Sequence, residues 1–177
     1  DPDGGYGVYH FHSGRDYVAG QTALALLARI AAGQNQNEAA LARGFDWLRA
    51  HPPKLTYEVG LVLMAFDARA APVGERQALD KMGAEELRKY TFPRTLEPRD
   101  RDYLQPLIDR LSRERFKECW SYGGEAPATA DMSNTQYAVL GLKAASRLGL
   151  NVDRELFADV LDYFLDHQQS HGKKVKY

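Results

Sequence analysis

The chain has 177 residues, of which 44% are hydrophobic and 27% charged, so it is long enough to bury a core and is typical of a folded soluble domain. Its 23 Lys and Arg residues nearly balance its 24 Asp and Glu residues, which gives a formal net charge of -1. This balance excludes the strongly positive surface by which proteins attract nucleic acid or anionic membranes. We therefore expect no nucleic-acid partner.

A single cysteine, Cys119, excludes an intramolecular disulfide and a Cys-rich zinc module. The apolar stretches at 22–28 and 59–66 are far shorter than the about 20 residues that a membrane-spanning helix needs, so no transmembrane span is expected. Neither feature assigns the chain to a cellular compartment. The chain opens with Asp-Pro-Asp-Gly-Gly at 1–5, without an initiator Met or a basic and then apolar leader. We expect it to be part of a larger protein.

Apolar residues recur at spacings of three and four, whereas strand-like alternation is scarce, so the pattern predicts an all-α protein. The first predicted helix covers 17–32, is rich in Ala and Leu, and ends at Gly33. The second covers 37–50 and ends before the prolines at 52–53. These two helices are predicted to form a helical hairpin.

A third helix is predicted over 56–71, where Pro72 ends it. Residues 73–102 are charged and rich in turn formers, and we interpret them as an insertion with a short helix at 83–90. An amphipathic helix is predicted over 103–117.

Two further helices complete the prediction. The helix over 134–148 begins with a predicted capping box, in which Ser133 is the N-cap and Gln136 its partner, and its small residues permit close helix contact. The last helix, 154–168, is predicted to be capped by Asp153. Its predicted buried stripe contains five apolar residues: Leu156, Val160, Leu161, Phe164 and Leu165.

The first and third of these hairpins are similar in sequence. Placing Gln21 and Thr22 over Asn134 and Thr135 needs no gap and pairs four further positions: Ala25 with Ala138, Leu27 with Leu140, Ala31 with Ala144, and Ala32 with Ala145. A weaker middle copy begins at Thr56. The repeat predicts three helical hairpins with these threonines near the starts of the inner helices.

Aromatic residues recur at the boundaries of the copies. Gly-aromatic segments precede the first and third copies, at 4–7 and 120–124, and aromatic-Leu pairs follow them, at 47–48 and 164–165. Glycine lets the backbone turn closely and a large ring fills the gap between hairpins. Three aromatic residues are therefore predicted to be structural: Trp47, Trp120 and Tyr122.

Three segments carry a family resemblance: Cys-Trp-Ser-Tyr-Gly-Gly at 119–124, Asp-Met-Ser-Asn-Thr-Gln-Tyr-Ala-Val-Leu-Gly-Leu at 131–142, and Tyr-Phe-Leu-Asp-His-Gln at 163–168. With the helical repeat, they resemble the repeats of squalene and other terpenoid cyclases and of protein prenyltransferase β-subunits, over most of the chain except 73–102. The resemblance implies an α/α toroid, whose inner helices line a central cavity. About three hairpins imply a partial or open barrel, completed by further repeats of a parent chain or by a second copy.

The catalytic groups of these families are not found in this chain. The cyclase Asp-x-Asp-Asp acid motif is missing, and we interpret the nearest acidic string, at 97–102, as a solvated loop. Cys119 matches the cysteine ligand of the prenyltransferase zinc, but Lys117 and Asn134 stand where its Asp and His ligands are expected. One remaining ligand is a weak zinc site. We expect no metal and no cofactor.

Two pairs of histidines are further candidates for metal ligands. His10 and His12 would share one face of a strand, but Asp16 is the single close acid, so we interpret them as a turn pair packed beside aromatic residues. His167 and His171 lie one helical turn apart near a basic tail, where we expect them to be exposed.

Polar and aromatic residues occupy the predicted starts of the inner helices, among them Gln21, Thr22 and Thr56. Such a rim suits binding, and the candidate ligand-binding residues are Tyr57, Glu58, Asp131, Asn134, Gln136 and Tyr137. Asp131 is alternatively a cap of the following helix. A glycosidase-like acid pair drawn from Glu58, Glu125 and Asp131 is a further possibility.

The resemblance and the missing catalytic groups together predict a toroid repeat module that is non-catalytic in this segment. Its expected partner is a hydrophobic small molecule or a protein. The alternative is a fragment of a divergent isoprenoid cyclase, of the squalene-hopene type, or of another α/α-barrel enzyme. Fold resemblance alone does not decide between them, because such folds carry many functions.

Overall fold

The computed structural model describes residues 3–6, 17–122 and 130–167, and all regular secondary structure within these ranges is helical. The helices are α1 (Val18–Ala31), α2 (Ala39–Ala50), α3 (Thr56–Ala70), α4 (Glu75–Leu79), α5 (Ala84–Lys89), α6 (Pro98–Arg113), α7 (Met132–Arg147) and α8 (Glu155–His167). The all-α prediction is confirmed. The predicted bounds of most long helices are correct to within about two residues, whereas α4 was not predicted and α6 begins earlier than expected.

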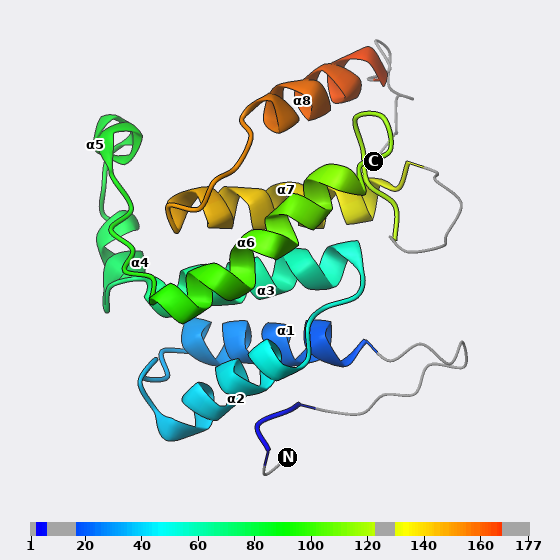
Figure 1. The fold of residues 1–177 in the computed structure, drawn as a ribbon. Coiled ribbons are helices and arrows are strands. Elements are labelled where there is room, and N and C mark those ends of the chain that lie inside the picture. The colour runs from blue at the N-terminus through cyan, green and yellow to red at the C-terminus, as the bar shows by residue number, and fades with distance from the viewer. Residues whose placement is uncertain (1–2, 7–16, 123–129, 168–177) are drawn as a thin grey trace, which may run out of the picture.

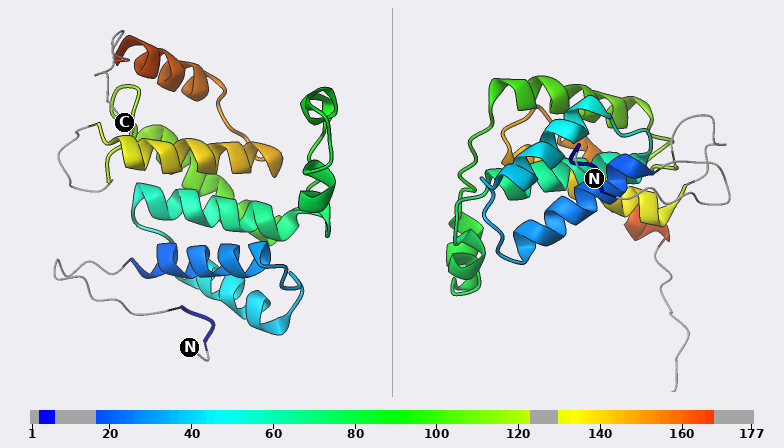
Figure 2. Two further views of the ribbon diagram at one scale, coloured as in Figure 1. Left: turned by 180° about the vertical axis from the view of Figure 1, so that it is seen from behind. Right: turned by 90° about the horizontal axis from the view of Figure 1, so that it is seen from below.

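The long helices form two layers (Figure 1). Helices α1, α3 and α7 run parallel and side by side, with α3 in contact with both neighbours. Helices α2 and α6 cover one side of this row, and α8 lies at its edge beyond α7 (Figure 2). Helix α1 packs with α2, and α3 packs with α6, with α4 and α5 inserted between α3 and α6 in the chain. Helix α8 follows α7 in the chain and completes the order of the described helices.

The core lies between the two layers. The rings of Phe45 from α2 and Phe66 from α3 meet edge to face with centroids 4.9 Å apart, and Tyr103 from α6 packs on Phe66 at 5.7 Å. The Tyr103 hydroxyl donates a hydrogen bond to the Leu48 carbonyl at 2.8 Å, which joins α6 to α2. Phe45, Phe66 and Leu48 are almost completely buried, so the outer helices are held by the same apolar cluster.

Two glycines set the close contact between α3 and α7. A Cβ on Gly60 would lie 2.3 Å from the backbone oxygen of Tyr137, and a Cβ on Gly141 would lie 2.7 Å from the Gly60 Cα atom. Real Cβ atoms do not approach other atoms so closely, so both positions require glycine. The small residues predicted to permit close helix contact therefore do so here.

We expect Gly60→Ala to destabilise the fold, although alanine favours a helix over glycine by about 1 kcal/mol. The new methyl group meets backbone atoms of α7, and overpacking of this kind typically costs about 1–3 kcal/mol. The melting temperature is the measurement, and Ser146→Ala on the exposed side of α7 is the control that should change little. An equal or higher melting temperature for Gly60→Ala would contradict this contact geometry.

The start of α7 differs from the predicted capping box. Asp131, not Ser133, is the N-cap: its Oδ1 atom accepts hydrogen bonds from the Asn134 N–H at 2.8 Å and from the Ser133 hydroxyl at 2.6 Å. The helix accordingly begins at Met132. The Ser133 prediction is wrong because the carboxylate two residues earlier accepts the same orphan N–H group of the first turn.

The acidic string at 97–102 is not the predicted solvated loop. Helix α6 begins at Pro98, a residue suited to a first helical position, and the string forms its N-terminal turn. Asp100 in this turn is only 5% exposed and accepts a hydrogen bond from Arg49 of α2 at 2.6 Å. An acid that looks surface-exposed in sequence is therefore buried because a distant arginine pairs with it.

The rest of the insertion is tied to the helical row by Arg94, whose side chain is 3% exposed. Its guanidinium donates to Asp67 of α3 at 2.6 Å and to both carboxylate oxygens of Glu75 at 2.7 and 2.8 Å. Arg147 of α7 donates to the other oxygen of Asp67 at 3.2 Å, and the Tyr90 hydroxyl donates to Glu75 at 2.9 Å. This buried ion network joins the insertion to α3 and α7.

The predicted buried stripe of α8 is only partly buried. Leu156 and Val160 are buried, but Leu161, Phe164 and Leu165 are 57%, 44% and 57% exposed. Asp153, the predicted cap, lies two residues before the helix, and its carboxylate accepts a hydrogen bond from the Glu155 N–H at 3.0 Å. Periodicity identifies an apolar face on a helix, whereas burial also requires a neighbour that covers it.

Candidate functional site

The parallel helices α1, α3 and α7 begin at the same end of their layer (Figure 1), and three tyrosines meet there. Tyr17 is the N-cap of α1, Tyr57 lies in the first turn of α3, and Tyr137 lies in the second turn of α7. The ring centroids of Tyr17 and Tyr57 are 5.8 Å apart, and those of Tyr57 and Tyr137 are 6.2 Å apart. We call these three residues the tyrosine row.

The middle ring of the row is half-buried and the outer end is accessible. Burial, followed by the negative charge of Glu58, raises the pKa of the Tyr57 phenol well above its usual range, so the group remains a neutral hydrogen-bond donor. The Tyr137 side chain is 37% exposed, as is Leu140 one turn further along α7. The row therefore offers aromatic and apolar surface to a ligand.

Glu58, a predicted ligand-binding residue, is only 1% exposed and is occupied by backbone groups. Its Oε1 atom accepts from the Gly20 N–H of α1 at 3.0 Å, and its Oε2 atom accepts from the N–H groups of Lys54 and Leu55 at 2.9 and 3.1 Å. The carboxylate thus caps α3 and bonds it to α1. Such a carboxylate is an acceptor in a structural role rather than a free acid.

Within residues 3–6, 17–122 and 130–167, three buried side-chain oxygens near the starts of the same helices have no hydrogen-bond partner: Gln21 Oε1, Thr56 Oγ1 and Asn134 Oδ1. Buried polar atoms are normally paired, so each of these atoms calls for a donor from water or from a ligand. Thr56 and Asn134 are only 1% and 2% exposed. The tyrosine row is thus accompanied by acceptors on all three helices.

The structure does not bring the six predicted binding residues into one site: three lie at the tyrosine row, two form the cap of α7, and one is exposed on α7. Tyr57 and Tyr137 contact each other in the row, with Glu58 beside them. Asp131 caps α7 through the Asn134 N–H, and hydrogen bonds from Ser133 and Asn134 hold the pKa of its carboxyl below the usual value. Gln136 lies exposed on α7.

Tyr17 was not among the predicted site residues. The available signal was its position at the start of the first inner helix, where the other two inner helices also carry a tyrosine within their first two turns. Sequence spacing alone did not reveal that its ring would contact Tyr57, since the two residues lie on different hairpins.

Equivalent threonines hold the segments that precede the inner helices. The Thr22 hydroxyl oxygen accepts from the Tyr6 N–H at 3.1 Å, and the Thr135 hydroxyl oxygen accepts from the Trp120 N–H at 3.0 Å. The Thr56 N–H donates instead to the Tyr122 carbonyl at 3.1 Å, which joins the Trp120 segment to the neighbouring hairpin. Related bonds in the first and third copies support the internal repeat.

The aromatic residues predicted to be structural differ in exposure. Trp120 is completely buried, and its indole N–H donates to the Leu111 carbonyl at 2.8 Å. Trp47 is 9% exposed and stacks on His51 with ring centroids 4.0 Å apart. The Tyr122 ring is 44% exposed, so this residue acts on its neighbours chiefly through its backbone carbonyl.

The possible metal ligands are separated in space or lie outside the described ranges. Cys119 is buried, and burial raises the pKa of its thiol, which disfavours the thiolate that metals bind. Within residues 3–6, 17–122 and 130–167, no group of three or more His, Cys, Asp or Glu side chains could hold a metal ion. His10, His12, Glu125 and His171 lie outside these ranges, and His167 is exposed.

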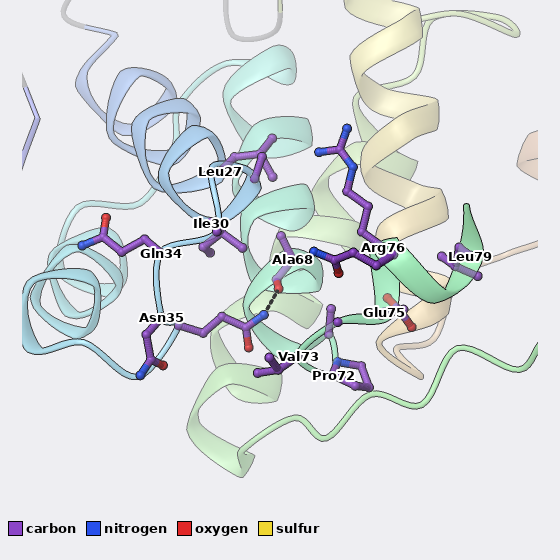
Figure 3. A pocket seen from close by; sticks show the side chains of 16 residues that line it. Leu27, Ile30, Gln34, Asn35, Ala68, Pro72, Val73, Glu75, Arg76 and Leu79 are labelled. Carbon is purple, nitrogen blue, oxygen red and sulfur yellow. Dashed lines mark hydrogen bonds between the residues drawn. The ribbon is translucent and has the colours of Figure 1, made fainter. Parts of the chain in front are cut away.

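A separate pocket of about 600 Å³ lies at the opposite end of the parallel helices from the tyrosine row. It lies between the C-terminal ends of α1 and α3 and the segment leading into α4 (Figure 3). Leu27, Ile30 and Ala68 form part of its apolar lining. Gln36, which also lines the pocket, donates a hydrogen bond to the Ala68 carbonyl at 3.1 Å. Its nearest carboxylate, Glu75, is already bound to Arg94. The tyrosine row is therefore the stronger candidate for a ligand-binding site than this pocket.

Comparison with protein-family models, curated proteins and solved structures finds no match for this chain. Along the part of the chain that the structure describes, no helix combines the length and apolar character that crossing a membrane requires.

Proposed function

We propose that this chain is a binding module of helical-hairpin repeats that holds a hydrophobic small molecule against the tyrosine row. The observation that carries this proposal is the continuous contact of Tyr17, Tyr57 and Tyr137 across three parallel helices, with one end accessible. Aromatic faces provide large apolar contact area and a polar hydroxyl at the rim. A ligand with an apolar body fits this surface.

The unpartnered oxygens of Gln21, Thr56 and Asn134 narrow the chemistry of the ligand. The Gln21 and Asn134 oxygens are acceptors, and the Thr56 hydroxyl can accept or donate. A polar group supplied by the ligand would remove the free-energy cost of leaving them without a partner among the described residues. We therefore propose a ligand with an apolar body and at least one hydroxyl or other donor group.

The state of the buried acids favours binding over catalysis. Each buried carboxylate in the described ranges has partners: Glu58 binds backbone N–H groups, Asp100 binds Arg49, and Asp67 and Glu75 bind Arg94. A general acid must instead hold a proton that it can deliver to a substrate. These paired carboxylates therefore favour a non-catalytic binding module over a fragment of an isoprenoid cyclase.

The parallel row with outer helices on one side is also the arrangement expected of an arc of an α/α toroid. We propose that this chain forms such an open arc, and that further repeats of a parent chain or a second copy extend it. The repeated threonine bonds at Thr22 and Thr135 support a repeat of this kind.

A fluorescence titration tests the proposed ligand chemistry. The probes are farnesol, an isoprenoid alcohol, and a hydrocarbon of the same carbon skeleton that lacks the hydroxyl group. We expect farnesol to bind more tightly than the hydrocarbon, and Tyr57→Ala to weaken its binding about tenfold, a typical effect of truncating an aromatic contact. Tyr90→Ala in the insertion is the matched control and should leave binding unchanged.

Two results would contradict the proposal. One is the absence of saturable farnesol binding to the wild-type chain while circular dichroism shows it to be folded. The other is an equal loss of binding in Tyr57→Ala and Tyr90→Ala. Conversion of the isoprenoid to a product would favour the cyclase alternative.

A further inference from the structure

Helix α8 presents an uncovered apolar face at the edge of the molecule. Leu161, Phe164 and Leu165 are spaced by three and four residues, lie on one side of the helix, and are each between 44% and 57% exposed. We call these three residues the α8 strip. Figure 2 shows α8 at the end of the layer, with α7 as its nearest long helix.

The α8 strip borders a hollow that could receive an apolar side chain. Phe164 and Leu165 line a hollow of about 480 Å³ together with Met132 of α7, which is itself 42% exposed. Tyr163 and His167 complete its wall. Two residues of the strip, Phe164 and Leu165, therefore border one shaped hollow, and Leu161 extends the exposed apolar surface along α8.

The same helix is strongly acidic. Glu155–His167 contains four acidic residues and no Lys or Arg. Asp162 and Asp166 line a second hollow of about 730 Å³, which also borders Tyr163 and His167. Glu118 and Lys117 line it too, so its acids outnumber its single lysine. Asp159 pairs with Arg115, whereas Asp162 and Asp166 have no ion-pair partner in the described ranges. Within the described ranges, an apolar hollow thus lies beside two acidic side chains that have no ion-pair partner.

The opposite edge of the molecule does not share this exposure. Residues 3–6 lie against α1 and α2 there: Gly5 contacts the Trp47 indole, and the Tyr6 N–H binds Thr22. Arg29 lies over the Tyr6 ring at 5.5 Å. One edge is covered by the chain's own residues, whereas no described residue covers the exposed side of α8.

We propose that the α8 strip is the docking site for a basic amphipathic helix of a partner protein. Apolar side chains of that helix would enter the groove between Phe164, Leu165 and Met132, and its Lys or Arg side chains would approach Asp162 and Asp166. Complementary charge selects the partner and orients it, while the apolar strip supplies contact area. A second copy of this chain fits poorly, since a two-fold contact would bring the acids of both α8 helices together.

The test uses two short helical peptides with the same leucine pattern, one with Lys and one with Glu at all polar positions. Fluorescence anisotropy measures their binding to the full chain. We expect the Lys peptide to bind and the Glu peptide to bind at least about tenfold more weakly, with the Lys complex weakened by added salt. Phe164→Ser and the double variant Asp162→Lys/Asp166→Lys should each weaken the Lys peptide about tenfold.

A matched control distinguishes the α8 strip from general charge attraction. The double variant Glu85→Lys/Glu86→Lys on α5 changes the net charge equally at an exposed site and should leave binding of the Lys peptide within about twofold. Equal binding of both peptides, or an equal loss in the α5 and α8 double variants, would overturn the proposal. So would a concentration-dependent dimer that Phe164→Ser abolishes, because a second copy would then occupy the strip.

Discussion

We expect Trp120→Ala to lower the free energy of unfolding by about 3–5 kcal/mol, the usual cost of truncating a buried Trp or Phe. Trp120 is completely buried, and its indole N–H donates to the Leu111 carbonyl of α6. Its backbone N–H also donates to Thr135 of α7. The substitution removes the indole packing and leaves the Leu111 carbonyl without that bond. The expected loss is a large share of the about 5–15 kcal/mol that stabilises a domain.

Urea denaturation of the wild type and two variants measures this effect. Tyr137→Phe is the control, because it removes only a hydroxyl from a side chain that is 37% exposed, and it should change the unfolding midpoint little. If Trp120→Ala kept the wild-type midpoint and instead abolished farnesol binding, Trp120 would be a residue of the binding site and its structural interpretation would be wrong.

We expect a loss of similar size, about 3–5 kcal/mol, for Arg94→Ala, since removal of one partner leaves buried charges uncompensated. The Arg94 side chain is 3% exposed, and those of Asp67 and Glu75 are 10% and 7% exposed. Arg147 still reaches Asp67, but Glu75 keeps only the Tyr90 hydroxyl. Arg88→Ala is the matched control: its ion pair with Glu85 is exposed, and such pairs contribute about 0–1 kcal/mol.

The Arg94 network also predicts a dependence of stability on pH. Burial alone raises the pKa of Glu75, but the hydrogen bonds from Arg94 and Tyr90 outweigh it and hold the pKa below the ordinary value of 4.5. A carboxyl whose pKa is lowered by folding stabilises the fold above its unfolded pKa, and this stability is lost as the pH falls through the folded pKa. The wild type should therefore lose stability below about pH 4.5, and Arg94→Ala should lose less over the same range. Parallel curves for the two proteins would contradict the role of Arg94.

The candidate site could be predicted in its residue types but not in its contacts. Helical periodicity placed Tyr57 and Tyr137 near the starts of two inner helices, where the structure has them. Their contact depends on how closely α3 and α7 approach, which Gly60 and Gly141 set. Glu58 was predicted as a possible ligand-binding acid, but its occupation by the Gly20 N–H depends on the neighbouring hairpin.

The sequence by itself determined the all-α class, the positions of most long helices and the repeat around Thr22, Thr56 and Thr135. These features are local, because helix periodicity, caps and proline breaks act over a few residues. Only the tertiary structure decided that Arg94 and Asp100 are buried and that the α8 strip is exposed. Burial depends on which distant segment covers a side chain, and the spacing of residues along one helix carries no information about that partner.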